Sequence, residues 1–253
     1  MGRIALALIA VGGCGYTEPT VGGDGANPPP ASCPTGDGTL RLCVQFDGAL
    51  TPTVGDGMHH TIQSTAVTEM TRTDEPAAHV GATSSMYIAP ADAGDLDVTN
   101  LTIEMWISAD TPPASGSKYW MLDNNTEYGM EYLDNGDIRC LIHDQIVDSV
   151  AAVETVHWHH VACTYNLHHL AVLIDGAVDN CQDLTNPIPT DGHDGVAIGA
   201  NVGAGPMFTE RFVGGLDNVR LYDRTLSGAE LCTIAGNGTS CNRMCPGGGE
   251  SDD

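Results

Sequence analysis

Hydrophobic and polar residues alternate along several short stretches of this chain, which is the pattern of β-strands with one buried face. The clearest stretch is LTIEMWI at residues 101–107, where every second residue is aliphatic or Met. Residues 40–46, 137–142, 158–165, 169–175, 196–199 and 215–222 also read as strands. Turn sequences such as Asp175-Gly176 separate them, and we expect 158–165 and 169–175 to form a hairpin.

A single segment carries a good helix signal. Ser227 and Glu230 have the spacing of a capping box, in which each side chain binds the backbone N–H of the other residue. The predicted helix runs from there to about Ala235, where Gly236 and Gly238 stop it. Many strands with one short helix indicate an all-β sandwich or jelly roll.

The two ends of the chain do not read as folded structure. Residues 1–14 resemble a bacterial lipoprotein signal, with Arg3, a short apolar run and small residues before Cys14. The resemblance implies a lipidated Cys14, and the alternative is an ordinary secretory signal with a chance cysteine. We expect a flexible Gly/Pro linker at 15–32, a folded domain at 33–245 and a disordered tail at 246–253.

This reading places the protein in the cell envelope. The run at residues 4–11 is too short to cross a bilayer as a helix, so the lipid on Cys14 is the expected membrane attachment. Gly15 follows Cys14, which by analogy with lipoprotein sorting suggests the outer membrane or cell surface. The chain has 33 acidic and 9 basic residues, and its net charge of -24 excludes a nucleic-acid binder.

Cysteine is frequent, with nine residues. Cys14 is assigned to the lipid, and in an exported protein the others are expected in disulfides. These eight are Cys33, Cys43, Cys140, Cys163, Cys181, Cys232, Cys241 and Cys245.

Four segments together resemble the laminin-G-like, concanavalin A-like jelly rolls of bacterial surface proteins. They are VQFDG at 44–48, LTIEMWI at 101–107, WHHVA at 158–162 with LIDG at 173–176, and GLDNVRLYDRTLS at 215–227. They cover roughly residues 39–235 in the family's order. The resemblance implies two antiparallel sheets stacked face to face, a fold that serves lectins, adhesion modules, glycosidases and spacers.

The resemblance also implies a structural calcium ion at Asp217. In related jelly rolls an aspartate at this position helps to hold calcium beside the first strand, and Asp47 and Asp56 are further candidate ligands. On a regular strand, Asp217 would share an apolar face with the residues at 219 and 221. The alternative is that Asp217 caps a turn or pairs with Arg220 or Arg224.

The same fold suggests where disulfides form. The first and last strands of a jelly roll are often neighbours, so we expect a bond from Cys33 or Cys43 to one of the C-terminal three cysteines. Among Cys140, Cys163 and Cys181, we expect two to pair.

Seven of the ten histidines cluster, at His59, His60, His157, His159, His160, His168 and His169. Imidazole binds zinc, nickel and copper. On a strand, however, His159 and His160 point to opposite sides, so we prefer a role in the fold.

A ligand surface needs aromatic faces beside hydrogen-bonding groups. Trp106 and Trp158 belong to the segments that resemble the family, so we expect them to be packed. The best candidate surface surrounds the predicted loop 123–127, and the alternative is a solvated rim with packed aromatics. Its residues are Tyr119, Trp120, Asn124, Asn125, Tyr128 and Tyr132.

No familiar catalytic motif occurs in the sequence. Glu127 and Glu131 would lie nearly 14 Å apart on a strand, too far for a glycosidase pair. We therefore expect a non-catalytic surface module that binds a glycan or a protein. The alternatives are a polysaccharide hydrolase on this fold and a passive structural protein of the envelope.

Overall fold

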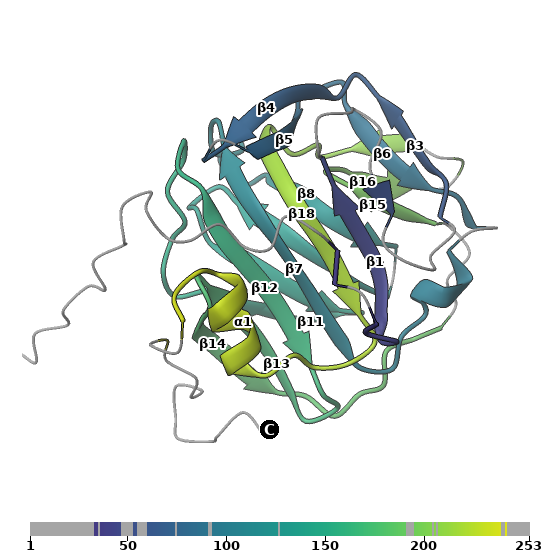
Figure 1. Cartoon of the computed structure of the whole chain (residues 1–253), viewed down its shortest axis with the longest axis vertical. Coiled ribbons are helices and arrows are strands. Elements are labelled where there is room, and N and C mark those ends of the chain that lie inside the picture. Colours follow the sequence, from purple (N-terminus) through teal and green to yellow (C-terminus); the bar gives the residue numbers. More distant parts are fainter. Residues whose placement is uncertain are drawn as a thin grey trace, which may run out of the picture.

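The computed structural model of the chain describes residues 33–34, 36–46, 53–54, 60–73, 75–90, 93–125, 127–190, 195–203, 205, 207–238 and 241. These residues form two antiparallel β-sheets stacked face to face, with one short α-helix near the C-terminal end (Figure 1). The predicted all-β jelly-roll sandwich is confirmed. The predictions for residues 1–32 and 246–253 lie outside the described residues.

The large sheet has nine strands in the order β14-β13-β12-β7-β18-β1-β2, with β5 also paired to β18 and β4 to β5. Its strands are β1 (Leu40–Gln45), β2 (Thr53–Val54), β4 (Thr68–Arg72), β5 (Glu75–Val80), β7 (Leu101–Ala109), β12 (His159–Tyr165), β13 (His169–Ile174), β14 (Ala177–Asp183) and β18 (Gly214–Tyr222). The first strand, β1, lies beside the last, β18.

The small sheet has seven strands in the order β11-β10-β9-β8-β15-β6-β3. Its strands are β3 (Ile62–Thr65), β6 (Ser85–Ile88), β8 (Lys118–Asn124), β9 (Tyr128–Leu133), β10 (Ile138–Ile142), β11 (Gln145–Asp148) and β15 (Val196–Ile198). A separate hairpin of β16 (Asn201–Gly203) and β17 (Met207–Thr209) packs on it through Val202 and Phe208, against Tyr87 and Ala197. A short 3-10 turn, η2 (Gly94–Leu96), precedes β7.

Apolar side chains from the facing sides of the two sheets form the main core. On β7, Ile103, Met105 and Ile107 are fully buried and belong to this cluster, as their alternation predicts. The segment 60–90 contains four strands that no sequence pattern indicated. The loop expected at 123–127 begins two residues later than predicted, because Asp123 and Asn124 belong to β8. Weak alternation in these segments concealed the strands.

The outer face of the large sheet is buried as well. On β7, Glu104 is 0% exposed and Trp106 is 9% exposed, although both lie on the face expected to meet solvent. At one end, helix α1 (Gly228–Ile234) covers this face (Figure 1), where Leu231 joins Ala162 and Leu173 in a second hydrophobic cluster. The central strands therefore lie inside the molecule on both sides.

Helix α1 begins where the sequence predicts. Ser227 is the N-cap, and both bonds of the capping box with Glu230 are present. The helix ends at Ile234 with Ala235 as its C-cap. None of the helices in the described ranges is long and apolar enough to cross a membrane.

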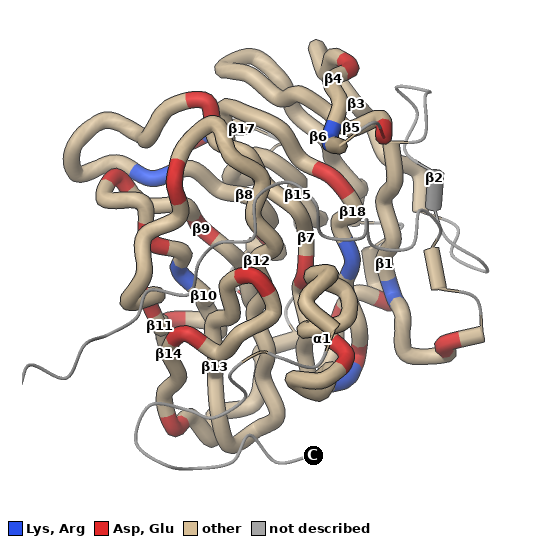
Figure 2. The backbone as a smooth tube through the Cα atoms, turned by 60° about the vertical axis from the view of Figure 1, so that its left-hand side comes forward, with Lys and Arg blue, Asp and Glu red and all other residues tan. Residues whose placement is uncertain are grey.

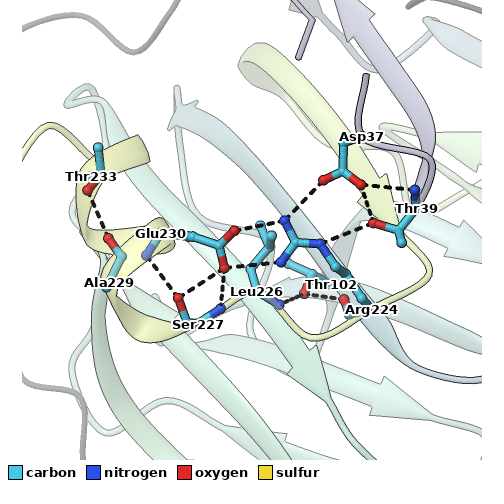
Figure 3. A network of polar contacts seen from close by, with 9 residues as sticks. All are labelled: Asp37, Thr39, Thr102, Arg224, Leu226, Ser227, Ala229, Glu230 and Thr233. Atoms are coloured by element: carbon cyan, nitrogen blue, oxygen red, sulfur yellow. Dashed lines mark hydrogen bonds and ion pairs between the residues drawn. The ribbon is translucent and has the colours of Figure 1, made fainter. Parts of the chain in front are cut away.

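Arg224 ties this helix to the start of the domain. Its guanidinium binds both carboxylate oxygens of Glu230, at 3.1 and 2.8 Å, and Asp37 at 3.0 Å (Figure 3). Thr102 of β7 completes the junction, because its hydroxyl donates to the Arg224 carbonyl and accepts the N–H of Leu226. The N-terminal turn, the central strand and the helix are thus held at one point.

Three disulfides are described, and they pair Cys33 with Cys43, Cys140 with Cys163, and Cys232 with Cys241. The bond between Cys140 and Cys163 is of the kind expected among the central cysteines, and it joins β10 of the small sheet to β12 of the large sheet. Cys181 is also disulfide-bonded, and Cys245 lies outside the described residues.

The expected bond from Cys33 or Cys43 to the C-terminal cysteines is wrong. The two residues bind each other, with Cα atoms 5.9 Å apart, because the short turn before β1 brings Cys33 back beside the strand. Although β1 and β18 are neighbours, Arg220 is the residue opposite Cys43.

Candidate functional site

The aromatic region chosen from the sequence is mostly packed inside the molecule. Tyr128 and Tyr132 are 2% and 1% exposed and lie in the main core. Their hydroxyls donate to the carbonyls of Leu96 and Val153. Neither ring presents a face to a ligand, so this part of the predicted surface is wrong. Strand β9 turns both residues inward because they occupy alternate positions with the buried Met130.

The remaining members of that region are held in place by their neighbours. Trp120 is 9% exposed and donates from Nε1 to Glu210 at 3.0 Å, and Asn124 is 4% exposed and donates to Glu127. Tyr119 is half-buried against the core, and Asn125 is half-buried in the turn after β8. The arrangement matches the alternative of packed aromatics.

A row of charged side chains crosses the outer face of the small sheet. Lys118 on β8 binds Glu131 on β9, whose side chain is 0% exposed. Arg139 on β10 lies 3.7 Å from Glu131 and makes two hydrogen bonds with Asp148 on β11. Burial raises the pKa of Glu131, although Lys118 and Arg139 oppose it. The row joins four strands and is internally paired.

Asp123 anchors the β16–β17 hairpin on the same face. Its Oδ2 atom accepts the N–H of Val202 at 2.8 Å, and the residue is 2% exposed. Burial raises the pKa of Asp123 to about 7, against the effect of this hydrogen bond. Asp123 and Glu131 are the type of carboxylates that a glycosidase uses. Both are buried, so a polysaccharide chain has no access to them.

A second charged cluster is buried on the outer face of the large sheet. The Glu104 carboxylate accepts a hydrogen bond from Arg220 at 2.7 Å and lies 3.0 Å from Nε2 of His160. The three side chains are at most 1% exposed. Burial raises the pKa of Glu104, but Arg220 and His160 outweigh this effect and hold the pKa below its usual range. This cluster holds β7, β12 and β18 together.

Asp217 lies on this outer face and not on the apolar inner face that a regular strand would give it. The pairing of β18 with β7 shifts between Asp217 and Arg220, where Asn218 adopts φ +49°. This bulge adds one residue and places Asp217 on the side of Arg220 and Tyr222, while Val219 points into the core.

The Asp217 carboxylate already has two partners in the described structure. Its Oδ2 binds Nε of Arg72 at 2.7 Å, and its Oδ1 accepts the N–H of Asn218 at 2.8 Å. A guanidinium already neutralises the only described carboxylate of the predicted site, because Asp47 and Asp56 lie outside the described residues. The partner is Arg72 and not Arg220 or Arg224, since the β4–β5 hairpin brings Arg72 over Trp106, with Cζ 4.7 Å from the ring centroid.

The histidines pair separately. His159 binds Asp175, His169 binds Asp183 and His157 lies 3.6 Å from Glu154. In the described ranges, no group of three or more His, Cys, Asp or Glu side chains is placed to hold a metal ion. His59 lies outside the described residues.

A depression of about 430 Å³ opens beside the N-terminal end of β12, lined by Thr73, Val156, His157 and Trp158. Trp158 is half-buried, whereas the other three are exposed. The loop is fixed to the end of β7, because the Val156 N–H donates to the Ala109 carbonyl at 2.8 Å. An aromatic ring, aliphatic methyl groups, a hydroxyl and an imidazole thus surround one hollow.

Two of the lining residues have strained backbones. Thr73 has φ +48° and Val156 has φ +59°, and both are β-branched. Such residues avoid positive φ, and each costs about 1–3 kcal/mol there. Backbone strain concentrates at binding and catalytic sites, and two of the eight described non-glycine residues with positive φ line this depression, so we take it as the candidate functional site.

Gly215 sets the position of the indole. A Cβ atom at residue 215 would lie 2.5 Å from Cη2 of Trp158 and 2.6 Å from Sδ of Met70. The ring can therefore lie on the backbone of β18 only because residue 215 has no side chain. Sequence reasoning missed this site, since Trp158 belongs to a segment that resembles the family's fold and was expected to be packed. Neither the strain nor the approach of Thr73 has a sequence signature.

A second depression, of about 330 Å³, is lined by His168, His169, Asp183 and Thr185. None of its four lining residues is Trp, Tyr or Phe, and His169 is already bound to Asp183. The depression at Trp158 has the better combination of apolar and polar groups for a small ligand.

Several solved structures share this fold. The binding domain of Paraclostridial Mosquitocidal Protein 1 superposes with TM-score 0.62 and 16% identity, covering 78% of this chain and 52% of that chain. The corresponding values for botulinum neurotoxin type C, whose cell entry depends on two ganglioside molecules, are 0.59, 11%, 78% and 50%. This chain therefore spans about half the length of these toxin chains.

Domain 4 of AbnA, an extracellular arabinanase from Geobacillus stearothermophilus, was solved in complex with arabinotriose. It superposes with TM-score 0.59 and 14% identity, covering 78% of this chain and 99% of that domain. These identities show a shared fold. No curated protein sequence matches the chain significantly.

The sequence family is defined more directly. A laminin G family model matches residues 81–232, which is more than half of the chain and extends from the end of β5 into α1. The chain belongs to the concanavalin A-like lectin/glucanases superfamily.

Proposed function

We propose that this protein is an exported, lipid-anchored surface module that binds a glycan without cleaving it. The depression at Trp158 is its binding site. Trp158 and Val156 supply an apolar surface for the C–H face of a sugar ring, and Thr73 and His157 supply hydrogen-bonding groups for its hydroxyls.

The observation that carries this proposal is the fixed, half-buried indole of Trp158 between two strained walls. A rigid aromatic surface loses little conformational entropy on binding, so even a shallow hollow can hold a small ligand. The volume of the hollow, about 430 Å³, is of the size that small ligands occupy. A flat protein interface normally needs about 800 Å² on each partner, which the four lining residues alone do not provide.

The comparisons support a binding role. AbnA domain 4, which this chain covers almost completely, was solved with an oligosaccharide, and the toxin chains are binding domains, one of them a receptor-binding domain. One botulinum binding domain was solved with rat synaptotagmin II, so a protein partner is the competing outcome. The burial of Asp123 and Glu131 supports a non-catalytic role.

The proposed location follows from Cys14. Lipidation there would leave residues 15–32 as a tether between the membrane and the domain. Cys14→Ser should move the protein from the membrane fraction to the soluble fraction, and Cys33→Ser is a control that leaves the anchor intact. A Cys14→Ser protein that stays with membranes would contradict the lipoprotein assignment.

The binding function is tested with the full chain on a glycan array, together with a screen for released reducing sugar. We expect binding to at least one glycan and no release of sugar. Trp158→Ala should weaken binding by about tenfold or more, which is the scale of a lost aromatic contact and its buried area. His157→Ala keeps the indole and should weaken binding without unfolding the domain, since its side chain is 60% exposed.

Val150→Ala is the matched control. Val150 is 75% exposed on the same loop but does not line the depression, so its loss should leave binding unchanged. Release of reducing sugar would overturn the non-catalytic assignment, and an array without any bound glycan would overturn glycan binding.

A further inference from the structure

We infer that the sugar held at the Trp158 depression carries no negative charge. The inference rests on the proposed function and specifies its ligand class. It comes from the distribution of charge over the described residues and from the groups at the rim of the depression.

Positive side chains in the described part of the chain are almost all neutralised. There are seven, Arg41, Arg72, Lys118, Arg139, Arg211, Arg220 and Arg224. All except Arg211 lie within 4.0 Å of an Asp or Glu carboxylate. Arg211 donates from Nε to the Ser84 carbonyl. Figure 2 shows the same imbalance along the backbone, where acidic positions are spread widely and basic positions are few.

None of the four residues lining the depression is a lysine or an arginine. The nearest arginine in sequence is Arg72, next to Thr73, but its side chain is 2% exposed and is bound to Asp217. Arg72 therefore neutralises a buried carboxylate and does not contact a ligand in the hollow.

The rim instead carries negative charge. Glu154 is 79% exposed and lies 3.6 Å from Nδ1 of the lining His157. Asp110 is 44% exposed and follows Ala109, the residue whose carbonyl binds the N–H of Val156. His79 is the partner of Asp110, at 2.8 Å.

The negative charges of Glu154 and Asp110 favour neutral sugars over acidic ones. Sialic and uronic acids carry a carboxylate, which proteins usually bind with arginine or with backbone N–H groups at a helix start. Here the acid group would meet Glu154 or Asp110, with no arginine or lysine of the described residues lining the depression, and like charges repel. A neutral sugar meets only the indole, the Val156 methyl groups, the Thr73 hydroxyl and the His157 ring, which satisfy its C–H face and hydroxyls.

The test compares neutral sugars with related sugars that carry carboxylates, using calorimetric titration of the full chain at low salt. Suitable pairs are lactose with sialyllactose, and oligosaccharides of galactose with those of galacturonic acid. We expect the neutral member to bind and the acidic member to bind about tenfold more weakly or not at all. Raising the salt concentration should reduce the difference, because the rim charges are exposed.

Charge reversal at the rim supplies a second measurement. Glu154→Lys should narrow the difference between neutral and acidic sugars by about threefold or more. Asp183→Lys is the matched control, since it makes the same change at a carboxylate that is 93% exposed and lines the other depression. It should leave the difference unchanged.

Each outcome separates the inference from the proposed function. If the acidic sugars bind as tightly as the neutral ones and Trp158→Ala abolishes this binding, the inference is overturned while the proposed function stands. If Asp183→Lys narrows the difference as much as Glu154→Lys, the rim does not select the ligand and the inference is likewise overturned. If sugars of neither class bind, the proposed function itself fails.

Discussion

Replacing Glu104 with glutamine removes the negative charge from a cluster that is buried on all sides. Arg220 and His160 both contact the Glu104 carboxylate, and the three side chains are at most 1% exposed. Glutamine keeps the shape and one acceptor oxygen, but it removes the carboxylate charge that faces the Arg220 guanidinium. Removing one partner of a buried ion pair costs about 3–5 kcal/mol of stability, and the retained hydrogen bond favours the lower end of this range.

The expected change is large enough to measure by thermal unfolding. For a domain of about 200 residues, each kcal/mol lowers Tm by about 2–4 °C, so Glu104→Gln should lower it by roughly 6–12 °C at pH 7. The Tm is measured by circular dichroism without reductant, so that the disulfides stay intact. Arg41→Gln is the control, since Arg41 is 35% exposed in its ion pair with Asp223, and exposed pairs contribute about 1 kcal/mol or less.

The pH dependence gives an independent check. The pKa of Glu104 is lower in the folded protein than its ordinary value of 4.5. Its stabilising effect is therefore present above that value and is lost as the pH falls through the folded pKa. The gap between wild type and Glu104→Gln should narrow on acidification below about pH 4.5. A Tm for Glu104→Gln within about 2 °C of wild type at pH 7 would refute the reasoning.

Three further changes have defined outcomes. The folded pKa of Asp123 is raised to about 7, so its stabilising contribution is complete below pH 3.8 and is lost as the pH rises through 7. The Tm of the wild type should therefore fall as the pH rises, and Asp123→Asn should remove the part of this fall that Asp123 causes. A variant whose Tm has the same pH profile as the wild type would contradict the raised pKa. Replacing Cys140 and Cys163 with alanine removes a disulfide of sequence separation 23 and should lower the free energy of unfolding in urea by about 3 kcal/mol. A double variant as stable as the oxidised wild type would contradict this expectation. Ser227→Ala removes the N-cap and should cost about 1 kcal/mol, whereas Ser227→Asp should restore it.

Sequence patterns were most informative where local rules decide the structure. Strand β7 follows its alternation of side chains, and α1 begins at the capping box formed by Ser227 and Glu230. Both depend on residues a few positions apart, and such short-range preferences can be read without the fold.

The errors have long-range causes. Asp217 changes face because a bulge adds one residue to β18, and its partner Arg72 is 145 positions away. Tyr128 and Tyr132 were expected at a ligand-binding surface, but β9 lies inside the small sheet and both side chains are in the main core between the sheets. The face of a strand that meets solvent depends on what packs over it, and the sequence of that strand does not contain this information.

The candidate site shows the same limit. Its walls come from the turn between β4 and β5 and from the loop before β12, which are separated by some eighty positions in the chain. Trp158 of the loop and Met70 of β4 both lie against Gly215 of β18, where a Cβ atom would meet them at 2.5 and 2.6 Å. The composition bears on the charge of the site, because a chain with few basic residues has few lysine and arginine side chains that could line a depression.

The disulfide between Cys33 and Cys43 determines how the domain carries mechanical load. A pull that reaches Cys33 from the N-terminal side passes through the sulfur atoms directly to Cys43, so the nine residues between them bear no tension. Cys43 sits within β1, opposite Arg220 of β18. The force is therefore applied inside the ladder and does not peel β1 from its end. The oxidised domain should withstand a stronger pull than the reduced one before β1 detaches.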